Sequence, residues 1–217
     1  MRSPRITLFL TDLSAFASCI CRNSLINWEK TAGRPKPMAA FRHILITGDV
    51  GIGKSTLIRK LLARFPGPVY GFITLKMAEP ASNFWPLYMF PAGLKVEERT
   101  CTKENLLGIR GAVKEQHPEI FDTLGVELIR SAGPDGVILM DELGFMESGA
   151  ALFQKAVLEA LHGELPVIAS VKNRPGVPFL DAIRSCPDTV LYTVTRENRD
   201  ALEREILQKE AAFFALH

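Results

Sequence analysis

The chain has 217 residues, of which 47% are hydrophobic and 23% charged, and these proportions are ordinary for one soluble globular domain. No apolar run reaches the roughly 18 residues that a membrane span needs, so we expect no membrane segment. The first 37 residues carry a net charge of +4, against +2 for the whole chain. The remainder therefore has no basic excess, which argues against a nucleic-acid-binding domain.

Residues 1–37 differ in character from the rest of the chain. Their basic start and apolar patch are similar to a secretory or lipoprotein signal, and their shortage of acids is also typical of a transit peptide. Asp12 interrupts the apolar run, however, and "GRPKP" ends the segment like a linker. We therefore expect residues 1–37 to be a disordered or non-native extension, and residues 38–217 to form the functional domain in the cytoplasm.

Apolar runs bounded by Gly and Pro predict strands, and apolar residues at helical spacing predict helices. The predicted strands are residues 41–48, 69–76, 84–93, 135–144, 166–172 and 189–195. The predicted helices are residues 54–65, 119–133, 149–163 and 196–216. The third strand is expected to pair antiparallel with the second, whereas the signals over 94–120 are weak. Because strands alternate with helices, we predict an α/β fold whose mostly parallel sheet is sandwiched by helices, with residues 77–118 as a β-rich insertion that forms a flap.

A phosphate-binding loop lies between the first predicted strand and the first helix. Residues 48–55, "GDVGIGKS", satisfy the P-loop pattern G-x-x-x-x-G-K-[ST]. The glycines let successive backbone N–H groups point at phosphates, and the following helix contributes its positive end. The predicted nucleotide-binding residues are Gly48, Asp49, Val50, Gly51, Ile52, Gly53, Lys54, Ser55 and Thr56. Lys54 would reach the β- and γ-phosphates, and the Ser55 hydroxyl would bind Mg²⁺.

Two acids end the apolar strand "VILMDELG" at residues 137–144. Asp141 would hold Mg²⁺ against Ser55, directly or through a bound water. In an extended chain the next side chain, Glu142, points the opposite way, where it would act as the general base for water attacking the γ-phosphate. The strand at 166–172 is expected between the P-loop strand and the acidic strand, an order that many P-loop hydrolases share. Glu142 could instead cap a loop or pair with a cation, and the nearby Glu147 is expected to be structural or to support the metal site.

Two further groups of residues are candidates for contacts with the nucleotide. Lys172, Asn173 and Arg174 follow a core strand, where a cation sensing the γ-phosphate would lie, and solvated surface charge is the alternative reading. Thr195, Arg196 and Asn198 follow the last strand, where they could contact the base. The alternative reading of the second group is a helix cap built by Thr195 and Asn198.

These residues resemble the cancer-related nucleoside-triphosphatase family, the THEP-type P-loop NTPases. The likeness is carried by "HILITGDVGIGKSTLI", "YGFIT", "ILMDELGFME" and "YTVTRENRDAL", and it covers the chain from about residue 40. The third stretch is similar to the family pattern D-E-[IL]-G-x-M-E, and the fourth to V-T-x-E-N-R. The resemblance implies a RecA-like α/β/α sandwich, slow Mg²⁺-dependent hydrolysis of nucleoside triphosphates with broad base tolerance, and no obligate partner.

The sequence thus favours a nucleoside-triphosphatase in which Lys54 and Glu142 are catalytic, Ser55 and Asp141 bind the metal, and Mg²⁺ is the cofactor. We expect nucleoside triphosphates as ligands and a monomer that needs no nucleic acid, membrane or obligate protein partner. A P-loop nucleotide or small-molecule kinase is one alternative, although residues 77–133 hold only Arg99, Arg110 and Arg130, too scattered for an arginine lid. A nucleotide-dependent switch protein is the other.

Overall fold

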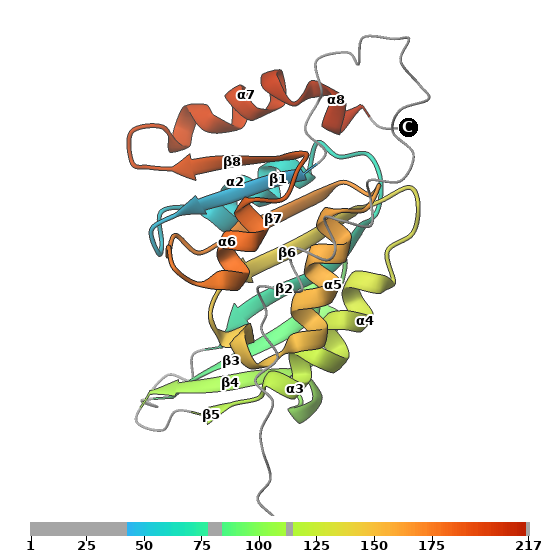
Figure 1. The fold of residues 1–217 in the computed structure, drawn as a ribbon, viewed down its shortest axis with the longest axis vertical. Coiled ribbons are helices and arrows are strands. Elements are labelled where there is room, and N and C mark those ends of the chain that lie inside the picture. Colours follow the sequence, from blue (N-terminus) through green and yellow to red (C-terminus); the bar gives the residue numbers. More distant parts are fainter. Residues whose placement is uncertain (1–42, 78–83, 112–114, 216–217) are drawn as a thin grey trace, which may run out of the picture. The chain divides into compact units, whose positions relative to one another are not determined.

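A computed structural model describes residues 43–77, 84–111 and 115–215, so the expected N-terminal extension lies outside the described residues. Its centre is one eight-stranded sheet with the order β5-β4-β3-β2-β6-β7-β1-β8 (Figure 1). The strands are β1 (His43–Gly48), β2 (Val69–Lys76), β3 (Phe84–Pro91), β4 (Leu106–Gly111), β5 (Glu115–Gln116), β6 (Val137–Leu143), β7 (Val167–Val171) and β8 (Thr189–Val194). Strands β2, β6, β7, β1 and β8 are parallel. The predicted position of β7 between β1 and β6 is confirmed.

Helices cover both faces of this sheet, as predicted. The longer helices are α2 (Lys54–Leu62), α5 (Ala151–Leu161), α6 (Pro178–Arg184) and α7 (Arg199–Lys209). Successive residues of a strand point to opposite faces, so Ile44 and Ile46 pack with the apolar faces of α2 and α7 whereas Leu45 packs with α5 and α6. Figure 1 shows α4 (Val126–Arg130), α5 and α6 together in front of the sheet. The fold is therefore an α/β sandwich with two apolar cores.

The insertion at 77–118 is β-rich as expected, but its described strands do not form a separate flap. β3 pairs antiparallel with β2, and β4 and β5 continue the same sheet antiparallel. Short 3₁₀ turns at Val96–Glu98 and Lys103–Asn105 connect β3 to β4. The insertion therefore widens the sheet that carries the P-loop.

Two predicted helices are interrupted in the structure. The segment predicted at 119–133 consists of α3 (Pro118–Ile120), a π-helical turn (Phe121–Gly125) and α4. The closing helix predicted at 196–216 begins at Arg199 and breaks at Glu210 before α8 (Ala211–Phe214). The buried Glu210 carboxylate accepts a 2.7 Å hydrogen bond from the Tyr192 hydroxyl of β8. α7 ends at this buried residue, and Phe213 of α8 packs into the core.

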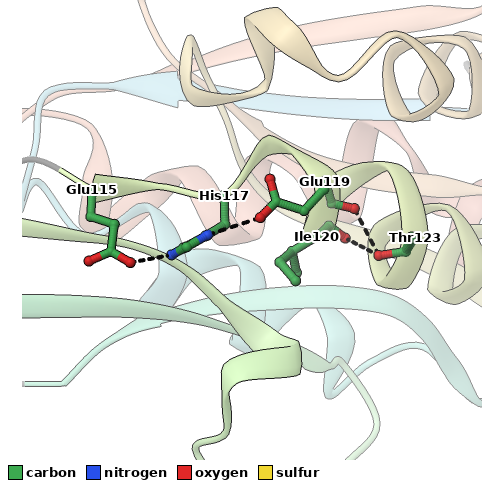
Figure 2. A network of polar contacts seen from close by, with 5 residues as sticks. All are labelled: Glu115, His117, Glu119, Ile120 and Thr123. Carbon is green, nitrogen blue, oxygen red and sulfur yellow. Dashed lines mark hydrogen bonds and ion pairs between the residues drawn. The ribbon is translucent and has the colours of Figure 1, made fainter.

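A histidine joins the edge of the sheet to the start of α3. Figure 2 shows the His117 ring between two carboxylates, with Nε2 2.7 Å from Glu115 Oε1 and Nδ1 2.9 Å from Glu119 Oε1. The Thr123 hydroxyl donates to the backbone carbonyl of Glu119 at 2.8 Å, which extends the network into the helix. The hydrogen bond to Glu119 is the largest cause that raises the pKa of His117, and Glu115 adds to it against partial burial.

The helices of the described residues are too short or too polar to span a membrane.

Candidate functional site

The P-loop lies between the end of β1 and the start of α2. Gly48, Gly51 and Gly53 all have positive φ angles, of 140°, 76° and 113°, which other residues rarely adopt. A side chain at Gly48 would also bring its Cβ to 2.5 Å from the Val194 carbonyl oxygen of the neighbouring strand. These glycines therefore allow the curled backbone that the sequence motif predicts.

Lys54 at the start of α2 folds back over its own loop. Its ammonium donates to the Gly48 carbonyl at 2.9 Å and to the Asp49 carbonyl at 2.8 Å. Partial burial lowers the pKa of Lys54, and the fields of Glu142 and Asp141 oppose that shift. Both acids of β6 therefore lie near the P-loop ammonium, as the sequence predicts. Ser55 and Thr56 follow in the first turn of α2, where both side chains are exposed.

Asp141 is buried at the carboxyl end of β6, with 8% of its surface exposed. The backbone N–H groups of Thr74 and Glu142 hydrogen-bond to its carboxylate, whose Oδ1 has no hydrogen-bond partner among the described residues. Burial, followed by the charge of Glu142, raises the pKa of Asp141 to about 6, although Lys54 opposes the shift. A buried carboxylate oxygen without a partner fits a group that binds Mg²⁺, directly or through the ion's water.

Glu142 does not continue the extended strand. Met140 lies opposite Ala169 and Leu143 opposite Val171, so β6 advances three residues while β7 advances two. The extra residue forms a β-bulge. Glu142 has a φ of 65°, a left-handed conformation uncommon for residues other than glycine. Glu142 therefore lacks the extended backbone on which the expectation of strand alternation rested, and its side chain is exposed.

The three residues after β7 have different surroundings. Lys172 extends across Gly144 and places its ammonium 4.8 Å from the centre of the Phe145 ring. The Arg174 guanidinium lies 5.5 Å from the same ring, and Asn173 is exposed. The charge of Lys172 acts on Lys54 and on Glu147, so Lys172 faces the P-loop and the acidic strand end.

The backbone after β7 is held by Arg184 of α6, which donates to the carbonyl oxygens of Lys172 and Arg174. Its guanidinium also contacts Asp181 at 3.0 Å. Phe145 and Arg184 were not among the residues predicted from the sequence. Phe145 lies within the stretch "ILMDELGFME", whereas nothing in the local sequence distinguishes Arg184 from other surface arginines.

The loop after β8 leaves the sheet beside the P-loop, because Val194 lies opposite Gly48. The backbone N–H of Thr195 donates to Asn198 Oδ1 at 2.8 Å, and the N–H of Asn198 donates to Thr195 Oγ1 at 3.3 Å. Asn198 also donates to the Thr193 carbonyl at 2.8 Å. These bonds match the alternative reading of this group as the start of a helix. The third member of the group, Arg196, is exposed.

Comparisons with known proteins agree with this geometry. Residues 43–207 match the family described as NTPase. A nucleoside-triphosphatase THEP1 of Thermofilum pendens is 31% identical over 188 residues, which cover 81% of this chain and 99% of the relative. A cancer-related nucleoside-triphosphatase homolog of Bos taurus is 29% identical over 184 residues, which cover 76% of this chain and 95% of the relative.

Solved structures show the same fold. The crystal structure of THEP1 from the hyperthermophile Aquifex aeolicus superposes with a TM-score of 0.56 and 26% identity, covering 76% of this chain and 97% of that one. The solution structure of a human cancer-related nucleoside triphosphatase gives a TM-score of 0.55 and 26% identity, covering 77% and 96%. With its P-loop, its acidic strand end and a family match over most of its length, this chain belongs to the NTPase family.

Proposed function

We propose that this chain hydrolyses nucleoside 5′-triphosphates, ATP and GTP among them, to the diphosphate and inorganic phosphate in a Mg²⁺-dependent reaction. One observation carries the proposal: Asp141 and Glu142 lie close enough to Lys54 that both carboxylates act on its ammonium. A phosphate-binding cation, a metal-binding acid and a candidate base therefore converge at the carboxyl ends of β1 and β6. Ligands bind at this edge in open α/β sheets.

Binding of the triphosphate would use the P-loop backbone and Lys54. The N–H groups of the curled loop and the positive end of α2 attract phosphate oxygens. Lys54 would exchange its two carbonyl acceptors for β- and γ-phosphate oxygens. Bound Mg²⁺ would neutralise charge on those phosphates, and the Ser55 hydroxyl and the Asp141 carboxylate would hold it.

Glu142 would act as the general base for the attacking water. As the water oxygen bonds to the γ-phosphorus, its proton passes to the Glu142 carboxylate, and the bond from phosphorus to the bridging oxygen breaks. The exposure of Glu142 supports this role, because the carboxylate is open to an attacking water and lies next to the buried Asp141. Uncommon backbone conformations such as that of Glu142 occur frequently at functional sites.

Of the three candidate sensors, Lys172 fits best as a second cation on the γ-phosphoryl group. Its charge already acts on Lys54, and its carbonyl is held by Arg184. Charge that develops on the γ-phosphoryl oxygens is stabilised by such a preorganised cation.

Arg196 is the candidate for the contact with the nucleobase, because Thr195 and Asn198 hydrogen-bond to each other. We further propose that the domain works as a cytoplasmic monomer without nucleic acid, membrane or an obligate protein partner.

The test is phosphate release from several nucleoside triphosphates, with and without Mg²⁺ and without any acceptor, together with binding of a fluorescent nucleotide. Glu142→Gln should bind nucleotide normally and lose most turnover, whereas Lys54→Ala should lose both. Release that needs an added acceptor would favour a kinase, and binding without release in the unaltered protein would favour a switch. Normal turnover in Glu142→Gln would refute the general-base assignment.

A further inference from the structure

A small cavity lies beside Glu142, on the side of β6 that faces α3. Its volume is about 10 Å³, and its polar lining comes from Thr74, Glu142, Glu147 and Lys172. The rest of the wall is largely apolar, with Leu87, Leu107 and Phe121 among its residues. About 10–15 Å³ accessible to the centre of a water-sized sphere is enough for one water molecule. The cavity therefore has room for about one water.

Two of the residues that line this cavity carry a buried oxygen atom with no partner in the part of the chain that the structure describes. These atoms are Oε2 of Glu147 and Oγ1 of Thr74. Glu147 is 1% exposed, so bulk solvent does not satisfy its second oxygen. A buried polar atom without a partner loses the hydrogen bonds that it made to water in the unfolded chain. An ordered water commonly satisfies such atoms where a polar cavity has room for one.

Glu147 is held rigidly on its other side. Its Oε1 accepts the N–H of Gly144 at 2.8 Å, and its backbone carbonyl accepts the Gln154 side-chain amide at 2.7 Å. Thr74 is held by β2, and its backbone N–H binds Asp141. Glu142, by contrast, makes no side-chain hydrogen bond to the described residues. Two residues that are held in place thus line the same cavity as Glu142.

The four polar groups match the hydrogen-bonding capacity of one water. The two carboxylates accept the two protons that a water donates, and the Thr74 hydroxyl and the Lys172 ammonium donate to its oxygen. We propose that Glu147 and Thr74 hold a buried water that hydrogen-bonds to the Glu142 carboxylate and orients it toward the attacking water. Glu147 is then a positioning residue for hydrolysis, and the inference rests on the proposed role of Glu142.

The test compares Glu147→Gln and Thr74→Val with the unaltered protein. Gln keeps the length of the side chain and an oxygen for the Gly144 N–H, and Val keeps the shape of Thr without its hydroxyl. Each change should lower kcat about tenfold, the effect of one lost orienting hydrogen bond, and should change KM and the Kd of a fluorescent nucleotide less than twofold. Thr74→Ser, which restores the hydroxyl, should return kcat to within about threefold of the original. The matched control is Glu159→Gln, an exposed acid of α5 that pairs with Arg130.

A double-mutant cycle separates positioning from a structural effect. If Glu147 acts through Glu142, adding Glu147→Gln to Glu142→Gln should leave the residual single-turnover rate unchanged. A further tenfold loss in that background would overturn the inference, as would a normal kcat in both Glu147→Gln and Thr74→Val while Glu142→Gln is inactive. A normal kcat in Glu142→Gln would overturn the general-base assignment on which this inference rests. If Glu147→Gln does not fold, Thr74→Val and Thr74→Ser decide the question in the same cycle.

Discussion

Asp141→Asn should stabilise the metal-free protein at neutral pH while it abolishes Mg²⁺-dependent turnover. The pKa of Asp141 is raised to about 6 from the ordinary 3.8, chiefly by burial. The folded state therefore binds this proton more tightly than the unfolded state does. For an acid with a raised pKa, the stabilising contribution is complete below about pH 3.8 and is lost as pH rises through about 6.

The magnitude follows from the size of that shift. A difference of about 2 pKa units corresponds to about 3 kcal/mol of unfolding free energy at pH 7.5. Asn removes the charge but brings an amide into a partly unpaired site, so we expect a net gain of about 1–3 kcal/mol. At pH 4 the gain should shrink below about 1 kcal/mol, because Asp141 is then protonated in the folded state.

Urea unfolding in EDTA at the two pH values measures this difference, with Asp135→Asn as the control at an exposed acid before β6. Added Mg²⁺ and nucleotide should then stabilise the unaltered protein more than Asp141→Asn, because only the former retains the carboxylate. A variant that is no more stable than the original at pH 7.5, or that shows the same difference at both pH values, would refute the reasoning.

Three further predictions concern the fold. Tyr192→Phe should lower the unfolding free energy by about 2 kcal/mol in urea, because Glu210 is buried and loses its hydroxyl partner; an unchanged midpoint would contradict this. Gly71→Ala should cost about 3 kcal/mol or more, since φ is 82° and the new Cβ would lie 2.1 Å from the Leu139 carbonyl oxygen; a soluble variant of normal Tm would contradict it. Because the pKa of His117 is raised, its stabilisation is present below about pH 6.5 and lost as pH rises through the raised value, so His117→Asn should lower Tm more at pH 6 than at pH 9.

The sequence predicted those features that local patterns encode. The P-loop requires glycines at positive φ between a strand and a helix. The apolar run of the strand, the glycines and the helical spacing of apolar residues all lie within residues 43–62. The strand order near the site followed from the acidic strand end and the run at 166–172. The apolar periods likewise placed both ends of α5, and the start of α7, to within three residues.

Other features depend on contacts between distant residues and left no local signal. The bulge at Glu142 is visible only in the register of β6 against β7. Glu210, where α7 ends, hydrogen-bonds to Tyr192, 18 residues earlier. β4 was missed because Gly108 interrupts a short strand that is stabilised by pairing with β3 rather than by its own pattern.

The cavity beside Glu142 was also beyond local reasoning. Its polar wall joins residues from β2, from β6, from the turn after β6 and from the loop after β7, four segments that only the folded sheet brings together. The Lys172 contact with Phe145 is of the same kind. Sequence patterns could name Lys172 as a candidate cation, but only the packing distinguishes it from Asn173 and Arg174.

Because Glu142 is the extra residue of the bulge, its deletion would remove the bulge and leave the rest of the strand pairing in place. Without Glu142, Asp141 would stand opposite Ser170 and Leu143 would still stand opposite Val171, so the ladder between β6 and β7 would become regular. The shortened chain would keep every buried residue of the strand and shed its one left-handed, non-glycine residue.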